Sequence, residues 1–62
     1  MRSYTVTYNN WYELGTFSSY KKAEEFAEEM KTDKEIREYH HQHEVPGSIA
    51  DLLSITDTTG EY

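Results

Sequence analysis

The sequence predicts a small α+β domain in which an antiparallel β-hairpin packs on one amphipathic helix (ββα), followed by a third strand and a short C-terminal helix. Three observations predict it: strict alternation over residues 3–8, a turn-forming Asn9-Asn10 pair, and apolar residues at helical spacing over 19–31. With 62 residues, the chain is expected to form a single compact domain over 1–62, with a polar and flexible tail over 56–62.

The hairpin is predicted from residues 3–17. Residues 3–8 alternate Ser or Thr with Tyr or Val, the pattern of a half-buried strand. Asn9 and Asn10 tolerate the positive φ that a type I′ turn requires, so residues 11–17 are expected to return as the second strand.

The register of this hairpin stays open. A two-residue turn pairs Val6 with Glu13 and places a carboxylate on the aromatic face. A longer loop pairs Val6 with Tyr12 and frees Trp11 from the ladder. Gly15 indicates a bulge or a close backbone contact.

Residues 19–31 predict the main helix. Ser18 or Ser19 can cap its first turn. The apolar stripe consists of Tyr20, Ala23, Phe26, Ala27 and Met30, and the opposite arc carries Glu24, Glu25, Glu28 and Glu29.

Residues 35–45 fit two patterns. We favour a third strand, because a two-stranded ribbon covers little of a helix. The alternative is a helix capped by Asp33, with Ile36, Tyr39, His40 and His43 on one face. Pro46-Gly47 then indicates a turn, and Ser48 is expected to cap a short helix over 49–53.

Charge and composition exclude several classes of protein. The net charge is −6, divided into +2 over residues 1–22 and −8 over residues 23–62. An acidic chain lacks the cations that direct nucleic-acid binding needs. There is no Cys, and no apolar run approaches the ~20 residues of a membrane span. The chain start has no apolar signal segment, so we expect a cytoplasmic protein without membrane contact.

No arrangement of residues predicts catalysis or a cofactor. The chain has no nucleophile-elbow sequence and no phosphate-binding glycine loop. We therefore expect that the protein is not an enzyme.

The histidines suggest an alternative function in metal binding. His41 and His43 share one face of a strand, whereas His40, His43 and Glu44 approach one another on a helix. Two ligands from one segment do not complete a site. A further alternative is a homodimer or larger homo-oligomer with a structural role, joined through Leu52, Leu53 and Ile55 or an open strand edge.

Two surfaces are candidates for protein binding, namely the acidic helix face with Glu24, Glu25, Glu28 and Glu29, and the hairpin tip with Tyr8, Trp11 and Tyr12. In size and acidity the chain resembles the small inhibitors that phages encode against host enzymes. We expect a regulator or inhibitor whose protein partner has a basic surface, such as a nucleic-acid-binding groove that the carboxylates would occupy in place of phosphates.

Overall fold

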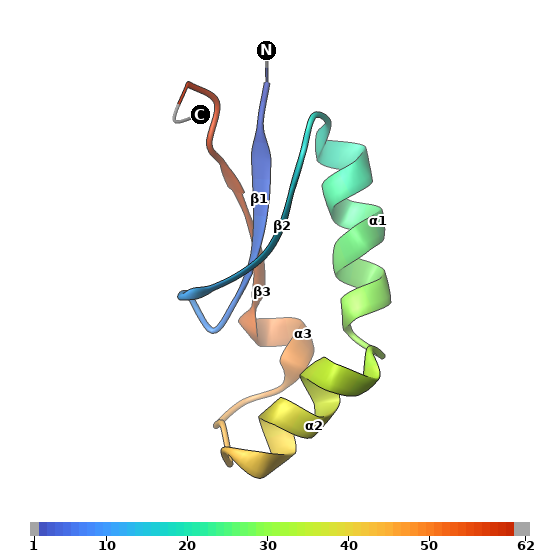
Figure 1. Cartoon of the computed structure of the whole chain (residues 1–62), viewed down its shortest axis with the longest axis vertical. Coiled ribbons are helices and arrows are strands. Elements are labelled where there is room, and N and C mark those ends of the chain that lie inside the picture. The colour runs from blue at the N-terminus through green and yellow to red at the C-terminus, as the bar shows by residue number, and fades with distance from the viewer. Residues whose placement is uncertain (1, 61–62) are drawn as a thin grey trace.

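The computed structural model describes residues 2–60 and confirms the predicted fold class (Figure 1). Over this range the elements are β1 (Tyr4–Tyr8), β2 (Tyr12–Phe17), α1 (Tyr20–Met30), α2 (Lys34–Gln42), α3 (Ile49–Leu52) and β3 (Leu53–Asp57). The strands form one antiparallel sheet in the order β2-β1-β3, so the N-terminal strand is the central one.

The third strand is not where the sequence analysis favoured it. Residues 35–45 do not form a strand, because Lys34–Gln42 is helix α2. The strand is Leu53–Asp57, which pairs along the whole of β1, with Val6 opposite Ile55. Asp33 favours the helix over the strand, because its carboxylate accepts a hydrogen bond from the Ile36 N–H and caps α2.

The hairpin turn follows the prediction for its two asparagines but not for its register. Asn9 and Asn10 have φ values of 56° and 63°, and the Trp11 N–H donates to the Tyr8 carbonyl at 3.4 Å. The ladder nevertheless resumes with Tyr8 opposite Tyr12. Trp11 is thereby left outside the sheet.

Both predicted registers are wrong, because the loop spans residues 9–11 and β2 then contains a β-bulge. Thr7 pairs with Glu13, yet the next residue of β1, Val6, pairs with Gly15, so Leu14 is the additional residue. Glu13 consequently lies with Thr7 on the face away from the helices. The loop over residues 9–11 therefore sets Glu13 opposite Thr7, and the bulge then places Gly15 instead of Leu14 opposite Val6.

Gly15 has the close contact that the sequence suggested. A Cβ atom at this position would lie 3.2 Å from the Phe17 ring and 3.6 Å from the Phe26 ring. The missing side chain lets these two rings pack against each other, with centroids 4.9 Å apart.

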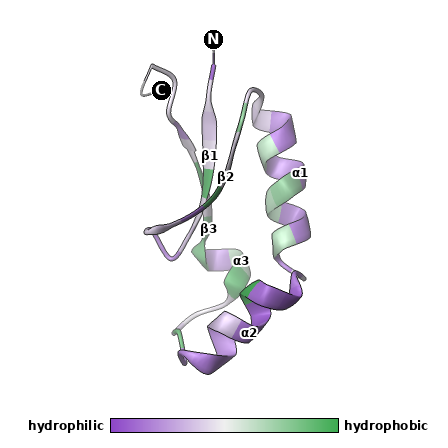
Figure 2. Ribbon diagram, viewed as in Figure 1, coloured by the Kyte–Doolittle hydropathy of each residue, from purple (hydrophilic) through white to green (hydrophobic). Residues whose placement is uncertain are grey.

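The core lies between the sheet and α1. Val6, Tyr8 and Ala23 are fully buried, and Ile36 is nearly so. Ser19 caps α1 by accepting from the Lys22 N–H, as one of the two predicted caps. Apolar residues on the central strand and on the inner side of α1 face each other, and polar residues cover the outer side of the helix (Figure 2).

The opposite face of the sheet carries hydroxyl groups, and none of the helices formed by residues 2–60 lies on it (Figure 1). Thr5 contacts Thr16 and Thr58 at 3.3 and 3.1 Å, and Thr7 contacts Ser54 at 2.8 Å. These cross-strand bonds satisfy the hydroxyl groups, including those of Thr5 and Thr58, which are buried.

The C-terminal segment begins with the predicted short helix. Ser48 caps α3 by accepting from the Asp51 N–H. Residues 56 and 57, expected in a polar tail, belong to β3, and the Thr58 N–H donates to the Ser3 carbonyl at 2.8 Å. Residues 61 and 62 of that expected tail lie outside the described residues.

Candidate functional site

Three aromatic side chains gather at the hairpin tip and will be called the aromatic cluster: Trp11, Tyr12 and Tyr39. Their centroids are separated by 5.5 Å for Trp11–Tyr12, 6.2 Å for Trp11–Tyr39 and 6.3 Å for Tyr12–Tyr39. The rings remain open to solvent, since Trp11 is 59% exposed and Tyr12 is 43% exposed. The cluster is therefore a surface feature and not part of the core.

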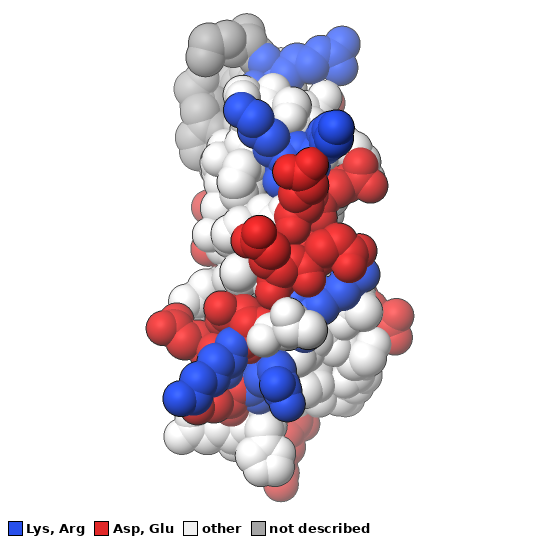
Figure 3. Space-filling view, turned by 90° about the vertical axis from the view of Figure 1, so that its right-hand side faces the viewer, with Lys and Arg blue, Asp and Glu red and all other residues white. Residues whose placement is uncertain are grey.

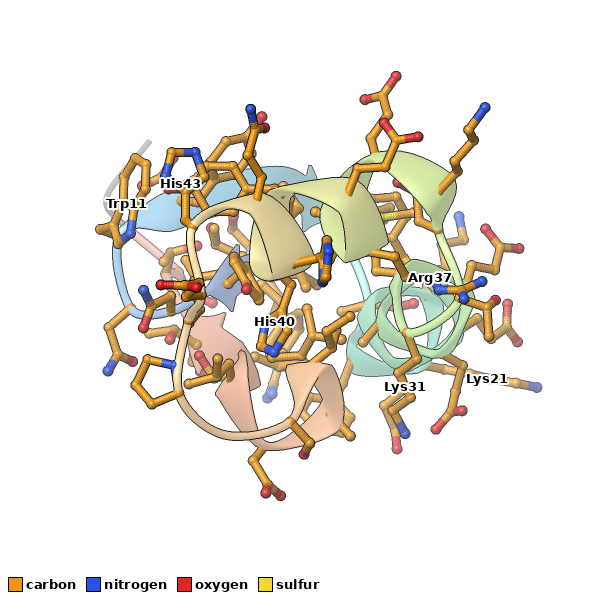
Figure 4. All side chains as sticks on the ribbon, turned by 90° about the horizontal axis from the view of Figure 1, so that it is seen from below. Trp11, Lys21, Lys31, Arg37, His40 and His43 are labelled. Atoms are coloured by element: carbon orange, nitrogen blue, oxygen red, sulfur yellow. The ribbon has the colours of Figure 1, made fainter. Side chains whose placement is uncertain are left out.

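Local structure explains this position. The asparagine turn directs the chain so that Trp11 leaves the ladder. Tyr39 reaches the hairpin from α2, on the helix face that also carries buried Ile36. The His43 ring packs on Tyr39, with centroids 4.3 Å apart, and in the view of Figure 4 His43 lies on the same side of the molecule as Trp11. The hairpin and α2 thus hold the rings in place from two directions.

A groove of about 370 Å³ adjoins the aromatic cluster between β2, the C-terminal half of α1 and α2. Its apolar wall includes Leu14, Phe26, Met30 and Ile36, and the rings of Tyr12 and Tyr39 lie beside them. An apolar groove with aromatic walls is the usual form of a site that receives a ligand or a peptide side chain.

The charged groups of this groove all have one sign. Glu13 comes from β2, whereas Asp33 and Glu35 come from the start of α2, and the lining residues include no Lys or Arg. The Asp33 carboxylate already accepts the capping hydrogen bond of α2. Glu13 and Glu35 are exposed, so they remain the carboxylates that can meet an incoming cation.

Tyr8, which the sequence analysis placed in the binding surface, lies beneath that surface. It is fully buried, and its hydroxyl bonds to His40 Nδ1, while His40 Nε2 lies 2.9 Å from the Gly47 carbonyl. A carbonyl only accepts, so Nε2 carries the proton and Nδ1 accepts from the Tyr8 hydroxyl. Burial raises the pKa of Tyr8, with a further contribution from the nearby Tyr39 hydroxyl. Tyr8 supports the groove from below and does not reach a partner itself.

The acidic face of α1 is exposed as expected, and it carries Glu24, Glu25, Glu28 and Glu29. Basic side chains also lie next to this acidic face. Figure 3 shows carboxylates over the middle of α1, with basic side chains beyond both ends of this group. Lys31 pairs with Glu28 at 2.8 Å, and Lys34 lies 3.9 Å from Glu38.

The three histidines have different surroundings. His40 points toward the sheet and uses both ring nitrogens within the chain, whereas His43 stacks on Tyr39 (Figure 4). His41 is exposed on α2. Over residues 2–60 there is no group of three or more His, Cys, Asp or Glu side chains arranged to hold a metal ion.

Sequence reasoning missed Tyr39 and Leu14 as site residues. The helical interpretation of 35–45 placed Tyr39 on the same face as Ile36, which is the signal that could have found it. Leu14 was expected on the apolar face of the hairpin, but its place as the additional residue of the bulge, beside the groove, was not predicted.

Comparisons with protein-family models, curated proteins and solved structures find no match to this chain. None of the helices within residues 2–60 combines the length and apolar character needed to cross a membrane.

Proposed function

We propose that this protein is a small, non-catalytic regulator or inhibitor that acts in the cytoplasm by binding another protein through its hairpin tip. The observation that carries this proposal is the aromatic cluster, in which the only Trp of the chain is 59% exposed while contacting two Tyr rings.

Such a cluster is suited to binding. Trp and Tyr are the side chains most enriched among residues that dominate binding energy at interfaces. Trp11 and Tyr12 contact each other, and Tyr39 is fixed by its contacts with Tyr8 and His43. Rings held in place before binding lose little conformational entropy when a partner arrives.

The charge of the protein complements this surface. The net charge of −6 favours encounter with a basic partner. The carboxylates of α1 could contribute at longer range, including toward a basic nucleic-acid-binding groove. The basic groups flanking them favour the hairpin tip as the central contact.

The test is affinity capture from a host lysate with matched variants. The double variant Trp11→Ala/Tyr12→Ala should lose the proteins that the wild type retains, since a single hot-spot residue contributes ~2 kcal/mol or more. Tyr20→Ala is the control, because Tyr20 is 50% exposed and lies on α1 against Tyr4. Equal retention by wild type and the double variant would refute the proposal.

A second variant separates the two surfaces. Reversal of Glu24, Glu25, Glu28 and Glu29 to Lys should leave the folded structure intact and reduce the rate of association. Complete loss of the partner with this variant, together with normal binding by the Trp11→Ala/Tyr12→Ala protein, would move the contact to α1.

A further inference from the structure

We infer that the groove between β2 and α2 receives a segment of the partner that presents an apolar side chain next to a Lys or Arg. This inference rests on the proposed function and specifies the chemistry of the partner. The geometry that carries it is an apolar groove whose charged lining residues, in the described part of the chain, are all acidic.

The apolar half of the occupant follows from the groove wall. Leu14, Phe26 and Met30 line it from β2 and α1, and Ile36 lines it from α2. Leu14, Phe26 and Met30 are only partly buried within this chain. A side chain that covers them removes further apolar surface from water, which is the main favourable contribution to such an association.

The cationic half follows from the charges. Glu35 lines the groove from α2, and Glu13 lies at its border on the edge strand β2, so the free charges that a cation would meet there are negative. The rings of Tyr12 and Tyr39 stand beside these acids and can accept a cation on their faces. An acidic segment would instead be repelled by the same groups.

Within residues 2–60, no Lys or Arg is among the residues that line this groove. Figure 4 shows Lys21, Lys31 and Arg37 on the opposite side of the molecule from Trp11. Arg37 and Lys34 line a separate groove next to α3. A cation that binds beside these acidic groups would therefore be supplied by the partner.

The test uses a displayed library of random dodecapeptides selected on the immobilised protein. We expect the selected peptides to be enriched in Lys or Arg adjacent to an aliphatic or aromatic residue. Failure to select any peptide, or enrichment of Asp and Glu, would overturn the inference.

A selected peptide then serves as the probe for two charge-matched variants. Glu13→Gln/Glu35→Gln should weaken its binding about five- to thirtyfold, the range for two exposed ion pairs of ~0.5–1 kcal/mol each. Glu24→Gln/Glu28→Gln removes the same charge on α1 and should change affinity less than about twofold. Equal weakening by both variants would mean general charge attraction and would refute the groove as the site.

Backbone amide shifts in NMR spectra locate the peptide directly. Binding should shift the signals of residues 12–14 and 35–39 and leave those of β3 unchanged. Shifts confined to α1 would overturn the inference. If lysate capture depends on Trp11 while no cationic peptide binds the groove, the proposed function stands and this inference fails.

Discussion

The Tyr8 hydroxyl and the His40 ring are hydrogen-bonded, and this contact joins the central strand of the sheet to α2. Because Nε2 of the same ring bonds to the Gly47 carbonyl, His40 also connects both elements to the loop before α3. No buried side-chain polar atom in the described part of the chain lacks a partner. The polar groups at this junction therefore depend on one another.

We predict that Tyr8 and His40 are energetically coupled. Tyr8→Phe leaves His40 Nδ1 unpaired and His40→Leu leaves the Tyr8 hydroxyl unpaired, at a cost of ~1–3 kcal/mol each, whereas the double variant leaves neither of these two groups. The Gly47 carbonyl loses its partner in His40→Leu and in the double variant alike, so this loss cancels in the comparison. The double variant should be ~1 kcal/mol more stable than the sum of the single effects, as measured by urea unfolding. Tyr4→Phe is the control, because its hydroxyl meets only exposed Arg2. Additive single effects would contradict the coupling.

The protein should lose stability in alkaline solution because of Tyr8. Burial raises the pKa of this hydroxyl in the folded state, so the unfolded chain releases the proton first as the pH rises. This contribution is complete below the ordinary Tyr pKa of ~10 and decreases as the pH rises from there through the folded-state pKa. Urea midpoints between about pH 9 and pH 11 measure it. The decline should be smaller in Tyr8→Phe, and an identical decline would contradict this assignment.

Replacement of Asp33 tests the start of α2. Asp33→Ala removes the acceptor of the Ile36 N–H and should cost ~1 kcal/mol, whereas Asp33→Asn keeps an acceptor and should cost only a few tenths. Thermal unfolding followed by circular dichroism distinguishes the two variants. Equal stabilities would show that the cap does not determine the helix.

Added acrylamide should strongly quench the fluorescence of Trp11 in the free protein. This residue is the only Trp, so the signal has one source, and its side chain is 59% exposed. Acrylamide should quench it nearly as well as a free Trp derivative. Iodide should be less effective at low salt, because the protein carries a net charge of −6. Resistance to both quenchers would place Trp11 in the interior.

The elements that could be predicted from sequence are those determined by neighbouring residues. The asparagine turn, the Ser19 and Ser48 caps and the apolar stripe of α1 all act within a few positions. The apolar residues over 35–45 fitted both the strand period of two and the helix period of 3.6 residues. The strand was preferred because the sheet needed a third strand. The 53–57 segment supplies it, and its alternation of Leu53 and Ile55 with Ser54 and Thr56 was the overlooked signal.

The candidate site was less predictable because it depends on contacts between distant segments. Trp11 and Tyr12 were identified by residue type, but Tyr39 joins them only when α2 folds against the hairpin. Tyr8 is of a residue type common at interfaces, but it is buried, because β3 and α2 pack against it from positions far along the chain.

The bulge in β2 inserts one residue, Leu14, that the ladder does not need but that lines the groove. Without Leu14, the remaining residues of β2 would pair with β1 in unbroken order and each would keep its present face. A shortened chain lacking Leu14 should therefore retain the hairpin while losing part of the wall of the groove. At this position the number of residues in β2, more than their identity, would distinguish a protein that binds its partner from one that folds but does not bind.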